Sequence, residues 1–252
     1  MRVKFTFSFE RNLILPIHYN HIIQGLIYNH IKDQRLQIRY HEQGFMSGNK
    51  RFKLFTFSRI YGNYKIDKEK NNIVFSSPIS ITVSGIEDVF VSELIQGIIS
   101  SEDLYINGTK VEVNGFVPIY VNLNKSNIQL EMMSPVTVYR AENRNGKRFT
   151  NYVSPHEVGF GELIAHNLIE KFQVLYPSER IEMGKIAIKP MFQDAPQYQK
   201  VLRFKDTIIK AWMGSFRLMA PPKILELAYY GGLGAKNSEG FGCFRIFGTG
   251  EK

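Results

Sequence analysis

The order of strand-like and helix-like apolar patterns is the feature that most constrains how this chain can fold. Residues 2–9 alternate apolar and polar side chains, which indicates a half-buried β-strand. Residues 18–34 repeat isoleucine and leucine at helical spacing, with Asn20 as a candidate N-cap. We expect further strands at 53–60 and 73–84, a helix at 87–99, and short strands at 104–106, 110–113 and 117–121. This order of strand, helix, strand, strand, helix, strand predicts a ferredoxin-like domain, an architecture that many RNA-binding sheets share.

The second half of the chain repeats the same order less clearly. We expect a strand at 128–139 with a break at Pro135, a helix at 155–176, and a short helix at 221–229 whose leading prolines suit its first turn. Further strands are expected at 181–189, 199–204, 208–218 and 243–247, and polar, irregular segments at 36–52 and 140–152. Turn composition at 122–128 places the domain boundary there, between an N-terminal domain of residues 1–125 and a C-terminal domain of residues 126–252. The predicted fold class is α+β, with two tandem ferredoxin-like (RRM-like) domains.

Charge and cysteine content narrow the classes of function. The 252 residues carry a formal net charge of +9, which favours an anionic partner, with nucleic acid first and a membrane surface second. Cys243 is the single cysteine, which excludes an internal disulfide framework and a multi-cysteine zinc site. The sequence has no apolar signal core and no transmembrane run, so we expect a cytoplasmic protein without a membrane partner.

The stretch from Tyr229 to Phe244, YYGGLGAKNSEGFGCF, is rich in glycine and joins a helix-like run to a strand-like run. It is not a P-loop, because Ala235 rather than glycine precedes Lys236. It is not a dinucleotide fingerprint, because Asn237 replaces the third glycine and the helix precedes the strand. Glycine allows positive φ angles and exposes N–H groups that can bind an anion. A tight turn and an anion-binding loop both remain open at this point.

Four of the six histidines, His18, His21, His30 and His41, fall within 24 residues. A metal site would need a further ligand in register, and carboxylates are sparse in this region, so we expect no metal ion and no cofactor. For any single histidine, a surface or hydrogen-bonded structural role is the simpler interpretation.

His41 differs from the other histidines because its polar, glycine-containing segment runs into Lys50, Arg51 and Lys53. An imidazole with an ordinary pKa near ~6.5 can give or take a proton at neutral pH, and the cations could hold a phosphate. Tyr28, on the polar side of the preceding helix, could add a phenolic hydroxyl. Such a set meets the needs of RNA cleavage without a metal: the 2′-oxygen loses a proton, the pentacoordinate phosphate is stabilised, and the leaving 5′-oxygen is protonated. From spacing alone, this is one interpretation among several.

Four segments, YNHIIQGLIY, YHE, KLFTFS and GLGAKNSEGFG, closely resemble the CRISPR-associated endoribonucleases that cut precursor CRISPR RNA within its repeats. These enzymes are members of the repeat-associated mysterious protein (RAMP) superfamily. Gly232, Gly234, Gly240 and Gly242 are similar to the superfamily's C-terminal loop, G-h-G-x(5)-G-h-G. The glycine motif also occurs in members without nuclease activity, and its combination with the N-terminal segments makes the resemblance specific.

The resemblance implies a catalytic site of tyrosine, histidine and lysine, which carry over to Tyr28, His41 and Lys53. It implies cleavage without a metal ion, giving a 5′-hydroxyl and a 2′,3′-cyclic phosphate, and leaves open which of Tyr28 and His41 is the base. The implied partner is CRISPR repeat RNA, and a CRISPR interference complex and a homodimer are further candidates. The residues expected to contact RNA are Lys50, Arg51, Arg140, Arg144, Lys147, Arg148, Gly232, Gly234, Lys236, Asn237, Ser238, Gly240 and Gly242.

The main alternative is a non-catalytic RAMP subunit that only binds guide RNA. A binding subunit has no need of Tyr28, His41 and Lys53 together, so these residues favour the nuclease. A charged loop such as 140–148 is often simply solvated, which is the alternative to a phosphate contact there. A small-molecule enzyme on the same scaffold gains no support from the net charge or the glycine motif.

Overall fold

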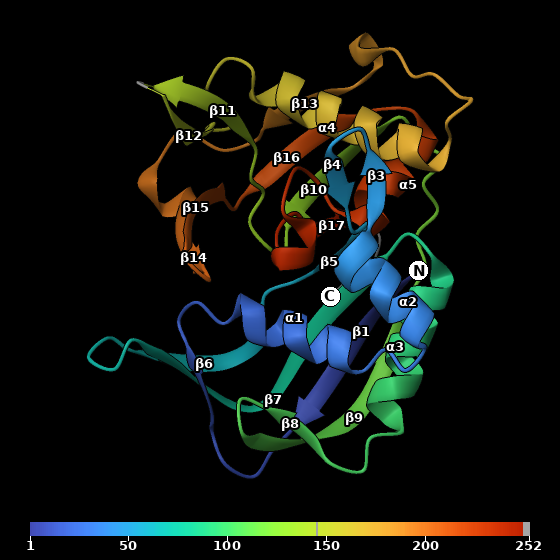
Figure 1. Ribbon diagram of the computed structural model, residues 1–252. Coiled ribbons are helices and arrows are strands. Elements are labelled where there is room, and N and C mark those ends of the chain that lie inside the picture. The colour runs from blue at the N-terminus through green and yellow to red at the C-terminus, as the bar shows by residue number, and fades with distance from the viewer. Residues whose placement is uncertain (145, 249–252) are drawn as a thin grey trace.

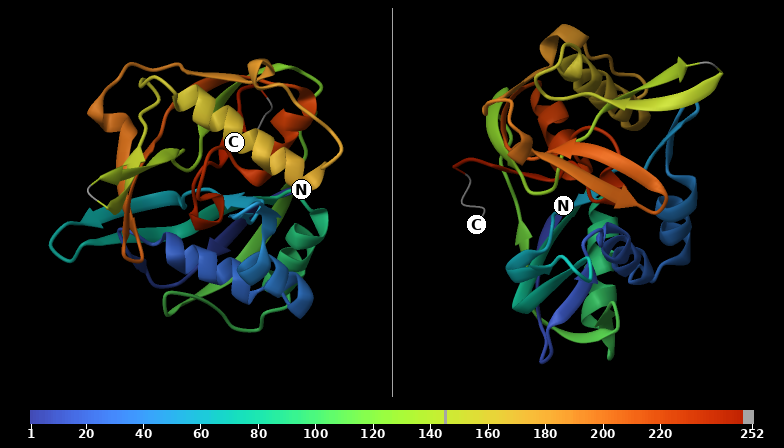
Figure 2. Two further views of the ribbon diagram at one scale, coloured as in Figure 1. Left: turned by 45° about the horizontal axis from the view of Figure 1, so that its top comes forward. Right: turned by 90° about the vertical axis from the view of Figure 1, so that its left-hand side faces the viewer.

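The protein consists of two α/β bodies, one from each half of the chain, stacked on one another (Figures 1 and 2). This computed structural model describes residues 1–144 and 146–248. The N-terminal half forms the lower body in Figure 1 and the C-terminal half forms the upper one. Each body carries a mainly antiparallel sheet with helices packed on it, and the prediction of two tandem ferredoxin-like domains is confirmed.

The N-terminal sheet is built around β1 (Arg2–Ser8), which lies between β7 (Asn72–Gly85) and β9 (Thr109–Ile119). Alternate side chains of β1 are buried, as their period of two predicts. The helices of this domain are α1 (Asn20–Asn29) and α3 (Asp88–Ile99). The other strands of the sheet are β2 (Leu13–Pro16), β5 (Phe55–Phe57), β6 (Tyr61–Asp67) and β8 (Leu104–Ile106).

The C-terminal sheet repeats this pairing scheme. Its central strand β10 (Asn127–Met132) lies between β16 (Ser215–Met219) and β17 (Phe244–Ile246), and β13 (Ala187–Pro190) pairs with the far edge of β16. In the first sheet, β5 and β6 pair with β7 in the way that β13 pairs with β16 here. The helices here are α4 (Phe160–Leu175) and α5 (Pro222–Gly231). We propose the domain division between residues 125 and 126, inside the connection from β9 to β10.

Two segments that were expected to be irregular are regular, and the prediction was wrong there. Residues 36–52 contain part of α2 (Gln34–Ile38), a π-helical turn (Arg39–Gln43), β3 (Phe45–Ser47) and β4 (Lys50–Phe52). Residues 140–152 form most of a hairpin of β11 (Tyr139–Arg144) and β12 (Lys147–Tyr152). The β3–β4 hairpin rises from the N-terminal domain to α4 of the C-terminal domain (Figure 1).

Several expected strands are shorter than predicted. The run 208–218 divides into β15 (Thr207–Trp212) and β16 because the chain bends at Gly214, whose φ is +124°. β15 pairs with β14 (Gln199–Phe204) in a separate hairpin. The first strand of the second domain ends at Met132, three residues before Pro135, and the strand expected at 181–189 begins only at Ala187.

Buried hydrogen bonds join the two domains. The fully buried guanidinium of Arg2 donates to Phe244 O at 2.7 Å and to Tyr229 O at 2.6 Å, and it lies 3.5 Å from the centre of the Tyr229 ring. The Thr56 hydroxyl donates to Phe241 O at 2.8 Å. Cys243, in the same region, is also fully buried. Within the described ranges 1–144 and 146–248, no helix is long and apolar enough to cross a membrane.

Candidate active site

Tyr28, His41 and Lys53 lie together, although they come from three different elements. Tyr28 is on α1, His41 is in the π-helical turn, and Lys53 follows β4. The rings of Tyr28 and His41 meet edge to face, with their centres 4.7 Å apart. Lys53 Nζ donates to the backbone oxygen of His41 at 2.6 Å. The three residues predicted to be catalytic therefore form one contiguous cluster.

The residue before His41 holds the π-helical turn in place. Tyr40 is completely buried, its ring stacks on Phe90 with centres 4.2 Å apart, and its hydroxyl donates to Glu87 at 2.8 Å. With Tyr40 anchored in the core, the His41 side chain is left exposed at the surface. The turn ends at Gly44, where φ is +63° and a Cβ would lie 2.6 Å from the Arg51 side chain.

Burial shifts the pKa values of two members of the cluster. Tyr28 is 7% exposed, and burial raises the pKa of its phenol, opposed by a hydrogen bond with the Ser238 side chain. The Tyr28 hydroxyl donates to Tyr40 O at 3.2 Å, so this group keeps its proton at neutral pH. Burial, and then the nearby Arg51, lower the pKa of Lys53 to about 8. The Lys53 ammonium therefore loses its charge much closer to neutral pH than an ordinary lysine.

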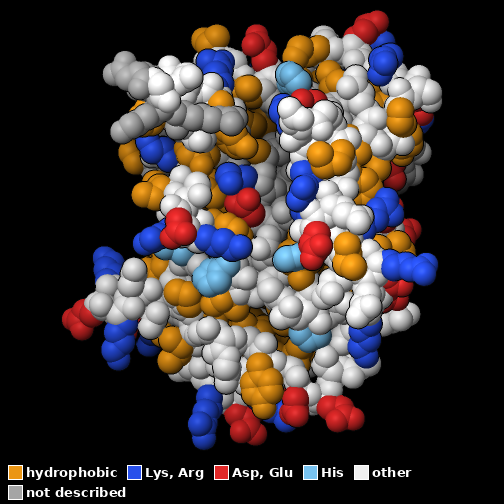
Figure 3. Space-filling model, in the orientation of Figure 1, with side chains coloured by type: hydrophobic (Ala, Val, Ile, Leu, Met, Phe, Trp, Pro, Cys, Tyr) orange, Lys and Arg blue, Asp and Glu red, His pale blue; other side chains and the backbone are white. Residues whose placement is uncertain are grey.

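A groove of about 610 Å³ begins at Lys53 and runs between the two domains. It is visible as the hollow in the middle of Figure 3, with basic side chains along its rim. β4 supplies one wall and β11 the other, while α4 and the glycine-rich stretch form the rest. Basic side chains combined with aromatic ones suit a single-stranded nucleic acid, whose phosphates and bases they can contact. The principal side chains in the walls are Lys50, Arg51, Phe52, Lys53, Tyr139, Leu163, His166, Asn167, Glu170, Lys236, Ser238 and Glu239.

Carboxylates neutralise part of the positive charge in the groove. Lys50 Nζ lies 2.6 Å from Glu170, whose other oxygen lies 3.6 Å from His166 Nδ1. Lys236 Nζ lies 3.2 Å from Glu239. A bound phosphate would compete with these carboxylates for Lys50 and Lys236.

The structure separates the residues expected to contact RNA into groups. Arg140 alternates with the groove-lining Tyr139 on β11, and its guanidinium donates to Val158 O at 3.1 Å, outside the groove. The side chains of Arg144, Lys147 and Arg148 lie outside the part of the chain that the structure describes. The predicted residues that line the groove are Lys50, Arg51, Gly234, Lys236, Asn237 and Ser238.

The glycine-rich stretch is more buried than expected. We expect its glycines to contact RNA, and in the structure the N–H groups of three of them donate to protein carbonyls. Asn237 is also 8% exposed, and its side-chain amide donates to Leu233 O and Phe241 O, both at 3.1 Å. The three N–H groups are those of Gly232, Gly240 and Gly242, and their acceptors are Ala228 O, Asn237 O and Pro135 O respectively.

Sequence reasoning missed the residues that organise this stretch. Lys171 of α4 is 1% exposed and donates a hydrogen bond to the backbone of the stretch. Asn20 and Gln24 of α1 donate to its backbone at Glu239 and Ser238. A signal for Lys171 was present, because it falls at helical spacing with Leu168 and Leu175 on the apolar face of α4.

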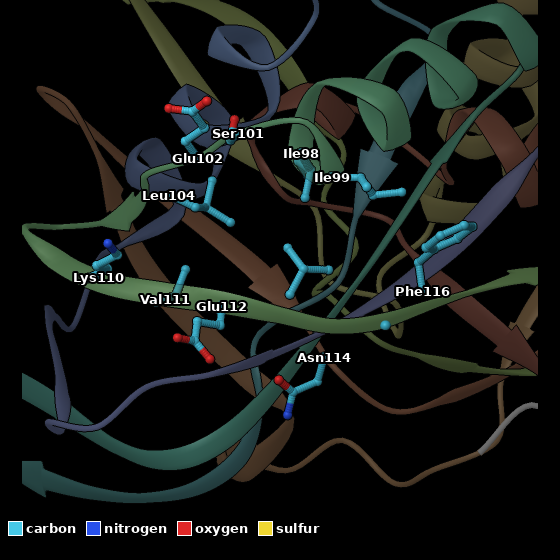
Figure 4. Close-up of a pocket in the computed structure, with 12 residues that line it drawn as sticks. Ile98, Ile99, Ser101, Glu102, Leu104, Lys110, Val111, Glu112, Asn114 and Phe116 are labelled. Atoms are coloured by element: carbon cyan, nitrogen blue, oxygen red, sulfur yellow. The ribbon is translucent and has the colours of Figure 1, made fainter.

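A second depression lies on the N-terminal domain, away from the Tyr28–His41–Lys53 cluster. It has a volume of about 450 Å³ and is lined by the end of α3 and by β8 and β9 (Figure 4). Lys110 in its wall is paired with Asp103 at 2.6 Å. Among the residues that the structure describes, no group of three or more His, Cys, Asp or Glu side chains is arranged to hold a metal ion.

Comparison with known proteins gives a consistent result over the whole chain. The profile "CRISPR associated protein Cas6, C-terminal" matches residues 119–246, and "CRISPR-associated protein Cas6, N-terminal" matches residues 14–116. The chain is 25% identical to the CRISPR-associated endoribonuclease Cas6 of Pyrococcus furiosus, over 95% of this chain and 86% of that protein. It is also 25% identical to CRISPR-associated endoribonuclease Cas6 2 of Methanocaldococcus jannaschii, over 96% of this chain and 98% of that protein.

Solved structures share the fold. The product of a Cas6-related gene from Pyrococcus furiosus superposes with a TM-score of 0.84 at 20% identity, over 98% of both chains. A structure described as a RAMP protein binding different RNA substrates gives a TM-score of 0.81 at 19% identity, over 98% of this chain and 99% of that one.

Proposed function

Because this chain belongs to the Cas6 family of CRISPR-associated proteins, we propose that Tyr28, His41 and Lys53 cut precursor CRISPR RNA without a metal ion. The relatives are named endoribonucleases, and this chain is an endoribonuclease that processes precursor CRISPR RNA. The observation that supports the finer proposal is the contact of the Tyr28 and His41 rings, with Lys53 bonded to the His41 backbone where a basic groove begins.

In this mechanism, the exposed His41 takes the proton of a ribose 2′-hydroxyl. The 2′-oxygen then attacks the adjacent phosphorus, and the bond from phosphorus to the 5′-oxygen breaks. Tyr28 is the proton donor, because a phenol that stays protonated at neutral pH can give a proton but not take one. The Lys53 ammonium stabilises the charge on the pentacoordinate phosphate. The products are a 2′,3′-cyclic phosphate and a 5′-hydroxyl.

The decisive experiment compares two repeat RNAs in EDTA, one of which carries a single 2′-deoxy nucleotide at the cut. We expect cleavage of the all-ribose RNA and none of the 2′-deoxy RNA. A requirement for Mg²⁺, or cleavage of the 2′-deoxy RNA, would contradict the mechanism. Tight binding of both RNAs without any cleavage would instead favour the alternative, a non-catalytic subunit that binds guide RNA.

His41→Ala tests the assignment of the base. General acid–base catalysis contributes roughly 10²–10⁴-fold, so we expect a rate loss in this range. Affinity for the 2′-deoxy RNA should change little, because the exposed imidazole is assigned to proton transfer rather than to binding. Equal losses in rate and affinity would make His41 a binding or folding residue.

A further inference from the structure

Lys171 is a buried lysine that the proposed mechanism does not use, and burial lowers the pKa of its side chain to about 7. Its Nζ donates to Gly232 O at 2.8 Å, to Gly234 O at 2.8 Å and to Asn237 Oδ1 at 2.7 Å. An ammonium group has three N–H donors, and each has an acceptor here. All three acceptors are neutral oxygens of the glycine-rich stretch, so the cost of burying the charge is offset by hydrogen bonds alone.

The glycines of the motif make room for the contact between Lys171 and Asn237. A Cβ on Gly232 would lie 2.5 Å from Asn237 Nδ2. A Cβ on Gly242 would lie 2.5 Å from the same nitrogen and 2.0 Å from Leu233 O. Asn237 thus bonds to Lys171 through its oxygen and to the loop backbone through its nitrogen. Lys171 and Asn237 together form a clamp inside the loop.

The clamped loop contacts the element that carries Tyr28. Ser238 O accepts a hydrogen bond from Gln24 Nε2 at 2.7 Å, and Glu239 O accepts one from Asn20 Nδ2 at 2.8 Å. The turn that begins at Asn237 also packs against α1, the helix that carries Tyr28. A continuous path of contacts therefore runs from the buried Lys171 through the loop to α1.

We propose that Lys171 is a positioning residue for RNA cleavage: it holds the glycine-rich loop in the conformation that packs against α1, the helix that carries Tyr28. This inference rests on the proposed function, because it assigns Lys171 to the same reaction. The Lys171 side chain is 1% exposed, and its Nζ donates to the loop rather than toward the groove. The identity of the side chain matters, because methionine has a similar length but no donor, and the planar fork of arginine does not match three converging oxygens.

The test is a double-mutant cycle of Lys171→Met and Gln24→Ala, read as the cleavage rate at saturating protein. If Lys171 acts through the contact of the loop with α1, the double variant should be no slower than Lys171→Met alone, with each single variant slowed by about 10-fold or more. Affinity of Lys171→Met for the 2′-deoxy RNA should change by less than about 3-fold, since the Lys171 side chain is buried. Multiplicative losses in the double variant, or a wild-type rate for Lys171→Met, would overturn the proposal.

Lys223→Met is the matched control, because Lys223 is an exposed lysine paired with Glu179 away from the groove. It should cleave at the wild-type rate, and an equal loss there would overturn a specific role for Lys171. If Lys171→Met does not fold, the double variant Asn20→Ala and Gln24→Ala tests the same path from α1. Slower cleavage with unchanged affinity is expected, and unchanged cleavage would overturn the proposal.

Amide hydrogen exchange separates a failure of this inference from a failure of the proposed function. Lys171→Met should accelerate exchange within 232–242 while leaving the strands of the N-terminal sheet protected. If the wild-type protein does not cleave repeat RNA, the proposed function has failed, and the exchange result still reports on the clamp. If the wild type cleaves but exchange in 232–242 is unchanged in Lys171→Met, only the positioning role has failed.

Discussion

At the scale of single residues, the choice of lysine at position 53 makes the site sensitive to pH. Burial and Arg51 lower the pKa of Lys53 to about 8, so the stabilising positive charge is present below that pH and lost above it. We therefore expect wild-type cleavage to decline as pH rises through about 8. Lys53→Arg keeps its charge because arginine does not deprotonate in proteins, so the part of the alkaline decline that comes from position 53 should disappear.

Single-turnover rates across a pH series, measured at saturating protein, check this prediction. Affinity for the 2′-deoxy RNA at each pH is the control, because it shows whether the charge acts on the reaction or on binding. The same alkaline decline in both proteins would rule out Lys53 as the titrating group.

Tyr28→Phe, measured with two leaving groups, tests the assignment of Tyr28 as the general acid and His41 as the general base. Loss of a general acid should matter little when the 5′-oxygen at the cut is replaced by sulfur, because a thiolate leaves without being protonated. We expect Tyr28→Phe to be slow on ordinary RNA and close to wild type on the 5′-thio RNA. His41→Ala should stay slow on both, and rescue of His41→Ala instead of Tyr28→Phe would reverse the assignment.

The candidate residues differ in how far the sequence could predict them. Spacing alone left His41 and Lys53 as one interpretation among several, and only the resemblance of YHE and KLFTFS to a known family selected them. Their contact depends on the π-helical turn, which no local sequence pattern predicts. Lys171 was passed over because a lysine is almost never fully buried, although its spacing placed it on the apolar face of α4.

At the scale of elements, the glycine-rich loop needs glycine because a Cβ would collide with neighbouring atoms, as well as for its backbone conformation. Gly242 and Gly108 have nearly the same φ, +79° and +78°, but a Cβ on Gly108 would meet nothing within 4 Å. Gly108→Ala should therefore cost only the strain of a left-handed residue, about 1–2 kcal/mol. Gly242→Ala adds a collision with Leu233 O and should cost about 3 kcal/mol or more.

Urea unfolding of the two variants measures the difference directly. The matched φ angles make Gly108→Ala the control for backbone strain. Equal free energies of unfolding would mean that the loop can relax around a new Cβ, and that the clamp does not constrain Gly242.

The elements that sequence patterns missed are those whose stability comes from distant parts of the chain. β3 and β4 have three residues each, too few for an alternating pattern to be visible, and β3 contacts α4 far along the chain. The polar β11–β12 hairpin carries little apolar alternation and so looked like a loop. By contrast, β1 buries every second side chain in a local pattern, and its position could be predicted.

At the scale of the whole molecule, Arg2 links the two domains. Alternation along β1 places Arg2 on the opposite face of the sheet from the buried Val3. From the sequence alone, that opposite face is expected to be exposed to solvent. The second domain covers that end of the face, and Arg2 donates to the backbone of α5 and β17. The tandem arrangement could be predicted from the repeated order of elements, but this contact between domains could not, because it depends on how they stack.

Replacing Arg2 should therefore destabilise both domains together. Arg2→Met removes the hydrogen bonds to Phe244 O and Tyr229 O, each from a charged donor and each contributing about 1.5–3 kcal/mol. We expect a loss of about 3 kcal/mol or more in urea unfolding. Arg11→Met, at an exposed arginine, is the control and should unfold like the wild type. Equal unfolding midpoints for the two variants would show that Arg2 does not couple the domains.

The single, buried Cys243 makes this protein well suited to site-directed labelling. A thiol-reactive probe would not reach Cys243 in the folded protein, so a cysteine introduced elsewhere would react alone. One probe on β4 and one on β11 would report the distance across the groove by spin-label or fluorescence spectroscopy. Recorded with and without the 2′-deoxy RNA, that distance would show directly whether the two walls close on a bound strand.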